Sequence, residues 1–137
     1  MKLTVMIADD DRVFSQLVAT RLRNFGFEVA VAFDAMQSFM QAVRTVPAAI
    51  LLDINMPAGS GLEVLKKLKN SSKTSHIPVL VLSGNGDPSM RATVKGLGAE
   101  EFFLKPPDLE LLEATLGRIL SLPVAAGAPA VPVLRAG

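Results

Sequence analysis

The sequence predicts an α/β domain with a five-stranded parallel sheet that is covered by helices on both faces. Two observations predict it. Short, almost continuously apolar runs alternate with longer segments whose apolar residues recur at helical spacing. Continuous apolarity is typical of strands in parallel sheets, and the alternation of strands with helices implies right-handed crossover connections. The chain has 137 residues, half of them apolar, which is enough for one such domain with a real core.

Five apolar runs are the predicted strands: Leu3–Ala8, Val29–Ala32, Ala49–Leu52, Ile77–Leu82 and Phe102–Leu104. Five stripes at helical spacing predict the helices: Phe14, Leu17, Val18, Leu22 and Phe25; Ala35, Phe39, Ala42, Val43 and Val46; Val64, Leu65 and Leu68; Met90, Val94 and Leu97; and Leu109, Leu112, Leu116 and Ile119. Asp34 and Asp108 are predicted N-caps. Gly26, Pro47 and Gly98 mark the ends of three helices.

Composition limits the classes of function. The net charge is +1 with acids and bases nearly balanced, so direct binding to nucleic acid, which needs a clustered basic face, is not expected. The absence of cysteine excludes disulfides and thiol catalysis and suits a reducing cytoplasm. No apolar run approaches the roughly 20 residues of a membrane span, and the N-terminus lacks the features of a signal peptide.

The domain is expected to occupy residues 1–121. Residues 122–137 are rich in proline, alanine and valine, have no regular period, and carry Arg135 as their only charge. This composition predicts an extended tail or a linker.

Polar residues follow four of the predicted strands. They are Asp9-Asp10-Asp11 after the first strand, Asp53 after the third, Ser83-Gly84 after the fourth and Lys105-Pro106 after the fifth. The carboxyl ends of parallel strands meet at one edge of the sheet, where such folds bind ligands. Carboxylates gathered there repel one another and need a cation, and oxygen ligands suit Mg²⁺.

A magnesium site beside a lysine and a hydroxyl is suited to handling a phosphoryl group. The sequence has no glycine-rich nucleotide-binding loop. A carboxylate can itself accept a phosphoryl group as an acyl phosphate, and Asp53, between the acidic run and Lys105, is the central candidate.

Four motifs in this order and spacing resemble the receiver domains of bacterial two-component response regulators, of the kind used in chemotaxis. The motifs are Ile7-Ala8-Asp9-Asp10-Asp11, Leu51-Leu52-Asp53-Ile54-Asn55-Met56-Pro57, Val81-Leu82-Ser83-Gly84 and Phe103-Leu104-Lys105-Pro106, and the likeness covers Lys2 to about Leu120. The resemblance implies a flavodoxin-like, doubly wound fold with five strands and five helices. It also implies that Asp53 accepts a phosphoryl group from a histidine kinase or a histidine phosphotransfer protein.

The same resemblance implies the other site roles. Asp10 and Asp53 would bind Mg²⁺ through their side chains, Asp9 would bind it directly or through water, and Asn55 would add its backbone carbonyl. Lys105 would pair with the phosphoryl oxygens.

The resemblance also implies a conformational switch. Ser83 would move to the phosphoryl group, beside which Gly84 leaves room for access. Phe102 would then turn inward as the switch aromatic, and the Lys105–Pro106 peptide bond resembles the family's cis bond. The output would be docking of a protein partner, or homodimerisation, through the surface of the fourth helix, fifth strand and fifth helix, with no turnover of an external substrate and no membrane binding.

The sequence departs from the common family pattern at a few places. Gly59 and Ser60 precede Gly61 where many receivers have an apolar residue and an aspartate. Serine at position 83 keeps the hydroxyl of the commoner threonine. Phenylalanine at position 102 lacks the hydroxyl of the frequent tyrosine, so a switch could act there only through ring packing.

Two alternatives remain open at this point. A degenerate receiver would use the same fold as a phosphorylation-independent interaction module, against which the complete set of polar residues argues. A haloacid-dehalogenase-like phosphatase also uses aspartate and Mg²⁺, and Asp9 and Asp11 superficially fit its nucleophile pair. The chain leaves little room for the cap of that class, and Asp53 with its Asn55-Met56-Pro57 run would go unexplained.

Overall fold

The computed structural model describes residues 2–56, 60–84 and 86–121, and these form five strands that alternate with five helices. The strands are β1 (Thr4–Ala8), β2 (Glu28–Ala32), β3 (Ala49–Asp53), β4 (Val79–Ser83) and β5 (Glu101–Leu104). The helices are α1 (Arg12–Asn24), α2 (Ala35–Thr45), α3 (Gly61–Asn70), α4 (Pro88–Gly96) and α5 (Leu109–Ile119). The predicted tail, residues 122–137, lies outside the described residues, so its expected character stays a prediction.

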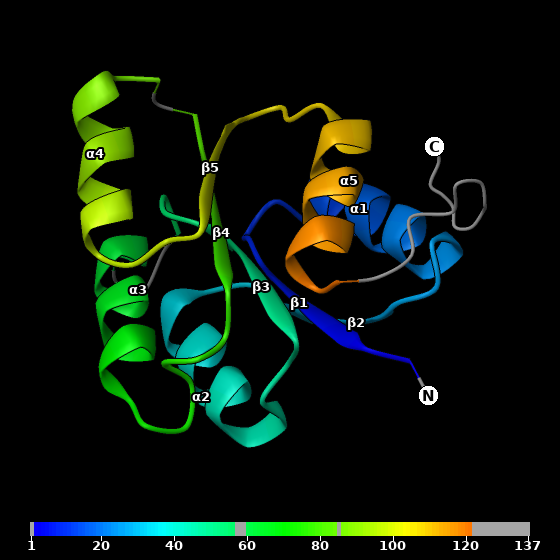
Figure 1. Cartoon of the computed structure of the whole chain (residues 1–137), viewed down its shortest axis with the longest axis horizontal. Coiled ribbons are helices and arrows are strands. Elements are labelled where there is room, and N and C mark those ends of the chain that lie inside the picture. Colours follow the sequence, from blue (N-terminus) through cyan, green and yellow to red (C-terminus); the bar gives the residue numbers. More distant parts are fainter. Residues whose placement is uncertain (1, 57–59, 85, 122–137) are drawn as a thin grey trace.

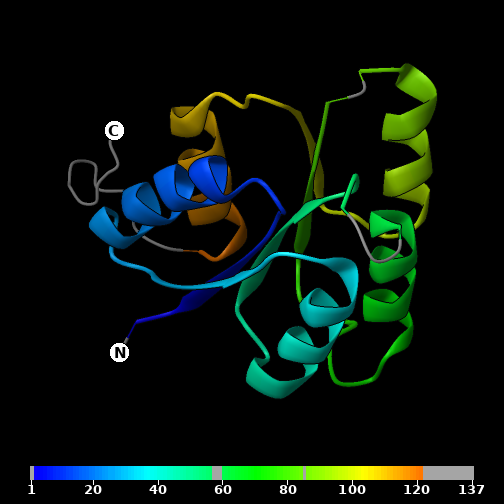
Figure 2. The same cartoon turned by 180° about the vertical axis from the view of Figure 1, so that it is seen from behind.

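All five strands are parallel and lie in the order β2-β1-β3-β4-β5. Helices α1 and α5 cover one face of the sheet and α2, α3 and α4 cover the other (Figures 1 and 2). The predicted flavodoxin-like, doubly wound α/β fold is confirmed. The chain reverses its direction of travel across the sheet after β2, so β1 and β3 lie side by side at the centre.

The three central strands are buried along their whole apolar length because helices cover both of their faces. Alternate residues of β1 face opposite sides: Val5 and Ile7 belong to the core under α1 and α5, and Met6 and Ala8 to the core under α2, α3 and α4. The expectation of complete coverage does not hold for β2. This edge strand has one exposed and three half-buried residues.

Several apolar residues do not lie where the sequence pattern predicted, among them Leu3, which precedes β1 and is 38% exposed, and Leu104, which ends β5 and is 50% exposed. Leu17 is 53% exposed, because the buried face of α1 is formed by Ser15, Val18, Ala19 and Leu22. Val46 is the C-cap of α2 with a left-handed φ of 44°, so it leaves the helical stripe and is 43% exposed. Ile77 is buried but precedes β4, which begins at Val79.

The helix boundaries follow local chemistry. The side chains of Asp11, Asp34 and Asp108 each accept a backbone N–H from the first turn of α1, α2 and α5, which confirms the two predicted N-caps. Helix α1 ends at Asn24 before Gly26, whose φ of 111° suits a glycine. Within the described residues, no helix is long and apolar enough to cross a bilayer.

Candidate functional site

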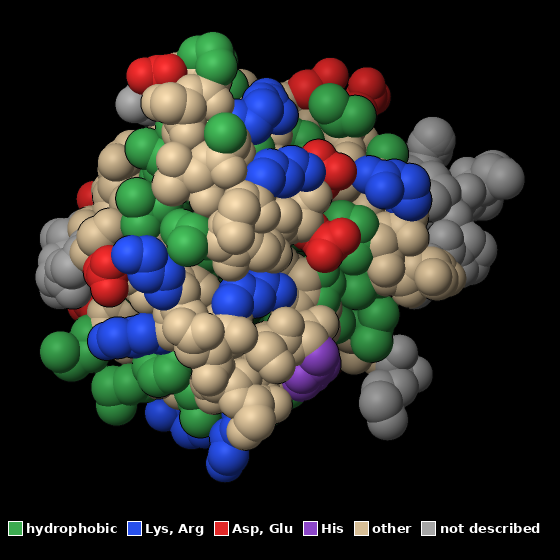
Figure 3. All heavy atoms as spheres, turned by 60° about the vertical axis from the view of Figure 1, so that its left-hand side comes forward, with side chains coloured by type: hydrophobic (Ala, Val, Ile, Leu, Met, Phe, Trp, Pro, Cys, Tyr) green, Lys and Arg blue, Asp and Glu red, His purple; other side chains and the backbone are tan. Residues whose placement is uncertain are grey.

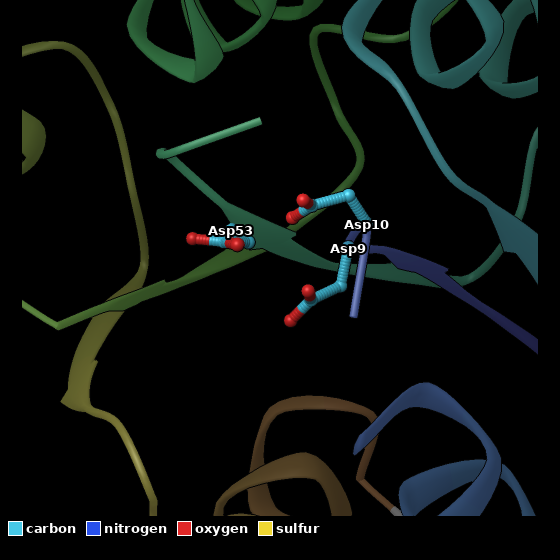
Figure 4. Close-up of side chains that lie close together, drawn as sticks. All are labelled: Asp9, Asp10 and Asp53. Carbon is cyan, nitrogen blue, oxygen red and sulfur yellow. The ribbon is translucent and has the colours of Figure 1, made fainter. Parts of the chain in front are cut away.

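The acidic cluster lies where β1 and β3 end side by side. Asp9 and Asp10 directly follow β1, Asp53 is the last residue of β3, and the two strands pair in parallel up to Ala8 and Leu52. One carboxylate oxygen from each of the three aspartates lies within 4.8 Å of the others. Figure 4 shows the three carboxylates extending to the same side of the strand ends. The sequence prediction that these residues converge is therefore correct.

The three carboxylates differ in their surroundings. Asp9 is fully buried and Asp53 is 4% exposed, whereas Asp10 is exposed and lies at the solvent side of the cluster. The buried carboxylates each accept a backbone N–H from two residues further along, Asp9 from Asp11 at 2.9 Å and Asp53 from Asn55 at 3.0 Å. These bonds fix the orientation of both side chains against the backbone.

Burial raises the pKa of Asp9 above its ordinary value, since the charged form loses its hydration. The hydrogen bond from Lys105 opposes that shift, and the nearby charge of Asp53 adds to it. Asp9 and Asp53 are both buried and their carboxylates lie close together. Without a cation, two negative charges in this position would repel each other.

Lys105 is the cation within the structure that faces this cluster. Its backbone N–H donates to the Ser83 carbonyl at 2.8 Å, which continues the pairing of β4 and β5. Its Nζ lies 2.8 Å from Asp9 Oδ2 and 3.6 Å from Asp53 Oδ2, and 4.5 Å from the centre of the Phe14 ring. Burial lowers the pKa of Lys105, but the hydrogen bond to Asp9 and the surrounding negative charges outweigh it, so the pKa is raised overall. The peptide bond from Lys105 to Pro106 is cis, as the sequence suggested.

Ser83 and Phe102 lie on the two neighbouring strands that complete this edge. Ser83 ends β4, one position beyond the residue that pairs with Asp53, and is fully buried. Phe102 of β5 is 5% exposed and belongs to the core under α2, α3 and α4. The Arg91 guanidinium of α4 lies 4.8 Å from the centre of its ring. Phe102 is thus already buried in this conformation, and its expected inward turn as the switch aromatic stays a prediction.

The motif loop after β3 is partly described. Asn55 is exposed, and Pro57 and Gly59 lie outside the described residues. Gly61 begins α3 pressed against the preceding backbone: a Cβ at this position would lie 2.3 Å from Ile54 Cα and 2.8 Å from the Asp53 carbonyl oxygen. Only glycine permits that approach, so this position fixes how closely α3 packs behind the acidic site.

A comparison with known protein families matches residues 5–117 to the response regulator receiver domain. The chain belongs to this family.

Known receivers and regulators agree with that assignment. This receiver is 32% identical to the DNA-binding dual master transcriptional regulator RpaA of Synechocystis sp. over 116 aligned residues. The alignment covers 85% of this chain and 48% of that protein. The chemotaxis response regulator CheY4 of Vibrio cholerae has a structure with a TM-score of 0.80 and 29% identity, covering 87% of this chain and 99% of that one.

The receiver domain of the sensor histidine kinase PA1611 of Pseudomonas aeruginosa has a similar fold, with a TM-score of 0.81 at 21% identity over 88% of this chain and 99% of that one. That structure is described with a magnesium ion coordinated in its active-site cleft. The present receiver spans about half the length, or less, of the curated relatives it matches.

The surface of α4, β5 and α5 carries charges of both signs. Glu101 Oε1 lies 3.7 Å from Lys95 Nζ of α4, and its Oε2 lies 3.7 Å from an Arg118 nitrogen of α5, so this glutamate links both helices across the edge strand. Figure 3 brings the α4 side of the receiver forward and shows basic and acidic side chains interspersed on it. The expected interaction surface is thus charged, and both signs are mixed across it.

Sequence reasoning missed one contact of the site. Phe14 was assigned only to the apolar stripe of α1, yet its ring faces the ammonium of Lys105. The sequence did indicate that Phe14 lies near the site, because it falls in the first helical turn after Asp9–Asp11 and therefore near the same sheet edge. The sequence could not show that the ring contacts Lys105, because the two residues are more than ninety positions apart in the chain.

Proposed function

We propose that this receiver is a phosphorylation switch in which Asp53 accepts a phosphoryl group from a phosphohistidine of a histidine kinase or a histidine phosphotransfer protein. A carboxylate oxygen of Asp53 forms a bond to phosphorus, the bond from phosphorus to the histidine nitrogen breaks, and the product is an acyl phosphate. One observation carries the proposal: at the carboxyl edge of the sheet, the Asp53 carboxylate lies within 4.8 Å of two further carboxylates and 3.6 Å from the Lys105 ammonium.

The residues proposed to hold Mg²⁺ are Asp9, Asp10 and Asp53 through carboxylate oxygens and Asn55 through its backbone carbonyl. The donor set fits, because it consists of oxygens alone and the three carboxylate oxygens lie within 4.8 Å of one another. When bound, the ion would neutralise the negative charge of the carboxylates and of the incoming phosphoryl oxygens. The magnesium ion of the similar PA1611 receiver supports this choice of metal.

Lys105 and Ser83 are proposed to stabilise the phosphoryl group once it is on Asp53. The Lys105 ammonium lies 3.6 Å from Asp53 Oδ2, a separation that a bound phosphoryl oxygen would bridge. Ser83 ends the neighbouring strand, so a small displacement of its hydroxyl would bring a second hydrogen-bond donor to the same group.

The proposed signal passes from Ser83 to the surface of α4, β5 and α5. Ser83 pairs with Leu104 of β5, and Phe102 lies two positions before Leu104 on the same strand. Movement of Ser83 would therefore alter the packing around Phe102 and change the contact of that ring with Arg91. The altered surface would then bind a downstream protein or a second copy of the receiver. No external substrate is turned over in this scheme.

Acetyl phosphate with Mg²⁺ tests the proposal. Intact mass spectrometry should show one added phosphoryl group on the wild type and none on Asp53→Ala. Asp34→Asn, which changes an aspartate N-cap away from the site to another good capping residue, should be phosphorylated like the wild type. A wild type that takes up no phosphoryl group would favour the phosphorylation-independent interaction module. An Asp53→Ala variant that is fully labelled would overturn the assignment of Asp53 as the phosphoacceptor.

A further inference from the structure

Among the described residues, three side chains form an ion pair or a ring contact with the ammonium of Lys105. Two are the carboxylates of Asp9, at 2.8 Å, and Asp53, at 3.6 Å, and the third is the ring of Phe14, whose centre is 4.5 Å away. A lysine ammonium carries three N–H donors. Its side chain here is 20% exposed, so the ammonium is largely shielded from solvent.

The position of Phe14 is set by the same segment that supplies the acidic cluster. The Phe14 N–H donates to the N-cap carboxylate of Asp11 at 3.0 Å, and the next residue, Ser15, donates its hydroxyl to the Asp9 carbonyl at 3.3 Å. Asp9 and the first turn of α1 are therefore tied together. These bonds place the backbone of Phe14 beside the acidic cluster, within reach of Lys105 for its ring.

We propose that Phe14 is a positioning residue for Lys105. An ammonium within about 6 Å of an aromatic centre is attracted to the face of the ring. The Phe14 face holds the ammonium from one side and Asp9 holds it from another, which leaves the remaining donor directed to Asp53. On the proposed function, to which this inference adds, that donor is the one that meets the phosphoryl oxygen.

The competing explanation is that Phe14 is only an apolar cover at the rim of the core, where it is half-buried against the cluster under α1 and α5. Leucine would serve as a cover but offers no aromatic face, whereas tyrosine would keep the face. Phe14→Leu and Phe14→Tyr therefore separate the two explanations. Phe25→Leu is the matched control, because Phe25 packs on the same cluster, stacks on Phe27, and has no cation over its ring among the described residues.

Two measurements test the proposal on the full chain. The first is the rate constant of phosphorylation by acetyl phosphate at saturating Mg²⁺, together with the Kd for Mg²⁺. Phe14→Leu should lower the rate constant about threefold to tenfold, the range expected for loss of a partly exposed cation–π contact. Its Kd for Mg²⁺ should stay within about twofold, since the Phe14 ring offers no ligand to the ion and its cation contact is with Lys105. Phe14→Tyr should keep most of the rate, and Phe25→Leu all of it.

The second measurement is independent of phosphorylation. The Cε protons of Lys105 should show an upfield ring-current shift in the NMR spectra of the wild type and Phe14→Tyr, and should lose it in Phe14→Leu. A missing shift in the wild type overturns the inference, as does a rate constant for Phe14→Leu equal to the wild type. Equal losses of rate in Phe14→Leu and Phe14→Tyr also overturn it, because they would assign the ring a packing role alone. If the shift is present but Asp53 takes up no phosphoryl group, the proposed function fails while the placement of Lys105 by Phe14 stands.

Discussion

Asp10→Asn should stabilise the metal-free receiver. The substitution removes one of three negative charges whose oxygens lie within 4.8 Å of one another. At that separation each like-charge pair costs about 0.9 kcal/mol in a water-like dielectric, the appropriate limit for an exposed group. Lys105 already offsets part of the charge on Asp9 and Asp53. The expected gain in the free energy of unfolding is therefore about 1 kcal/mol.

Chemical denaturation in EDTA at low ionic strength would measure this gain, and added salt should reduce it because exposed charges are screened. With excess Mg²⁺ the wild type should instead be more stable than Asp10→Asn. An ion that binds only the folded state stabilises it more the more tightly it binds, and the variant lacks one carboxylate that is proposed to hold the ion. Asp108→Asn is the control: it removes an exposed carboxylate from the N-cap of α5, where asparagine also caps. An Asp10→Asn variant that is clearly less stable than the wild type in EDTA would refute the reasoning that this cluster is a repulsive cation site.

Three further predictions concern the same edge of the sheet. Gly61→Ala should destabilise by about 2 kcal/mol or more, because its Cβ would meet backbone 2.3 Å away, whereas Gly96→Ala, with open space around it, should be neutral or slightly stabilising in thermal unfolding. In EDTA, the free energy of unfolding should fall as pH rises from about 3.8 through the raised pKa of Asp9, because in this range the folded state holds more protons than the unfolded state. Asp9→Asn should flatten this part of the plot of stability against pH. Ser83→Ala should still be phosphorylated but should lose the amide shifts around Phe102 that beryllofluoride, a phosphoryl mimic, causes in the wild type; equal shifts in both proteins would remove Ser83 from the relay.

The sequence alone determined the fold class and predicted which polar residues gather at one edge of the sheet. Short, continuous apolar runs are typical of strands in a parallel sheet, and this pattern is local, so it can be recognised without any tertiary contact. In a parallel sheet, every residue that follows a strand lies at one edge. The positions of Asp9, Asp53, Ser83 and Lys105 after four different strands were therefore sufficient to predict that they meet.

Tertiary structure decided which side chains touch there, and how. The sequence could not order the two separations of Lys105, 2.8 Å to Asp9 and 3.6 Å to Asp53, nor place Phe14 on the third side of its ammonium. It also mistook Leu17 for a buried residue, because Ser15, Val18, Ala19 and Leu22 form the buried face of α1. The spacing of apolar residues shows which side of a helix is apolar, but it does not show how the helix is rotated and tilted against the sheet. That orientation, and with it the contacts of the site, comes from packing between segments that are distant in the chain.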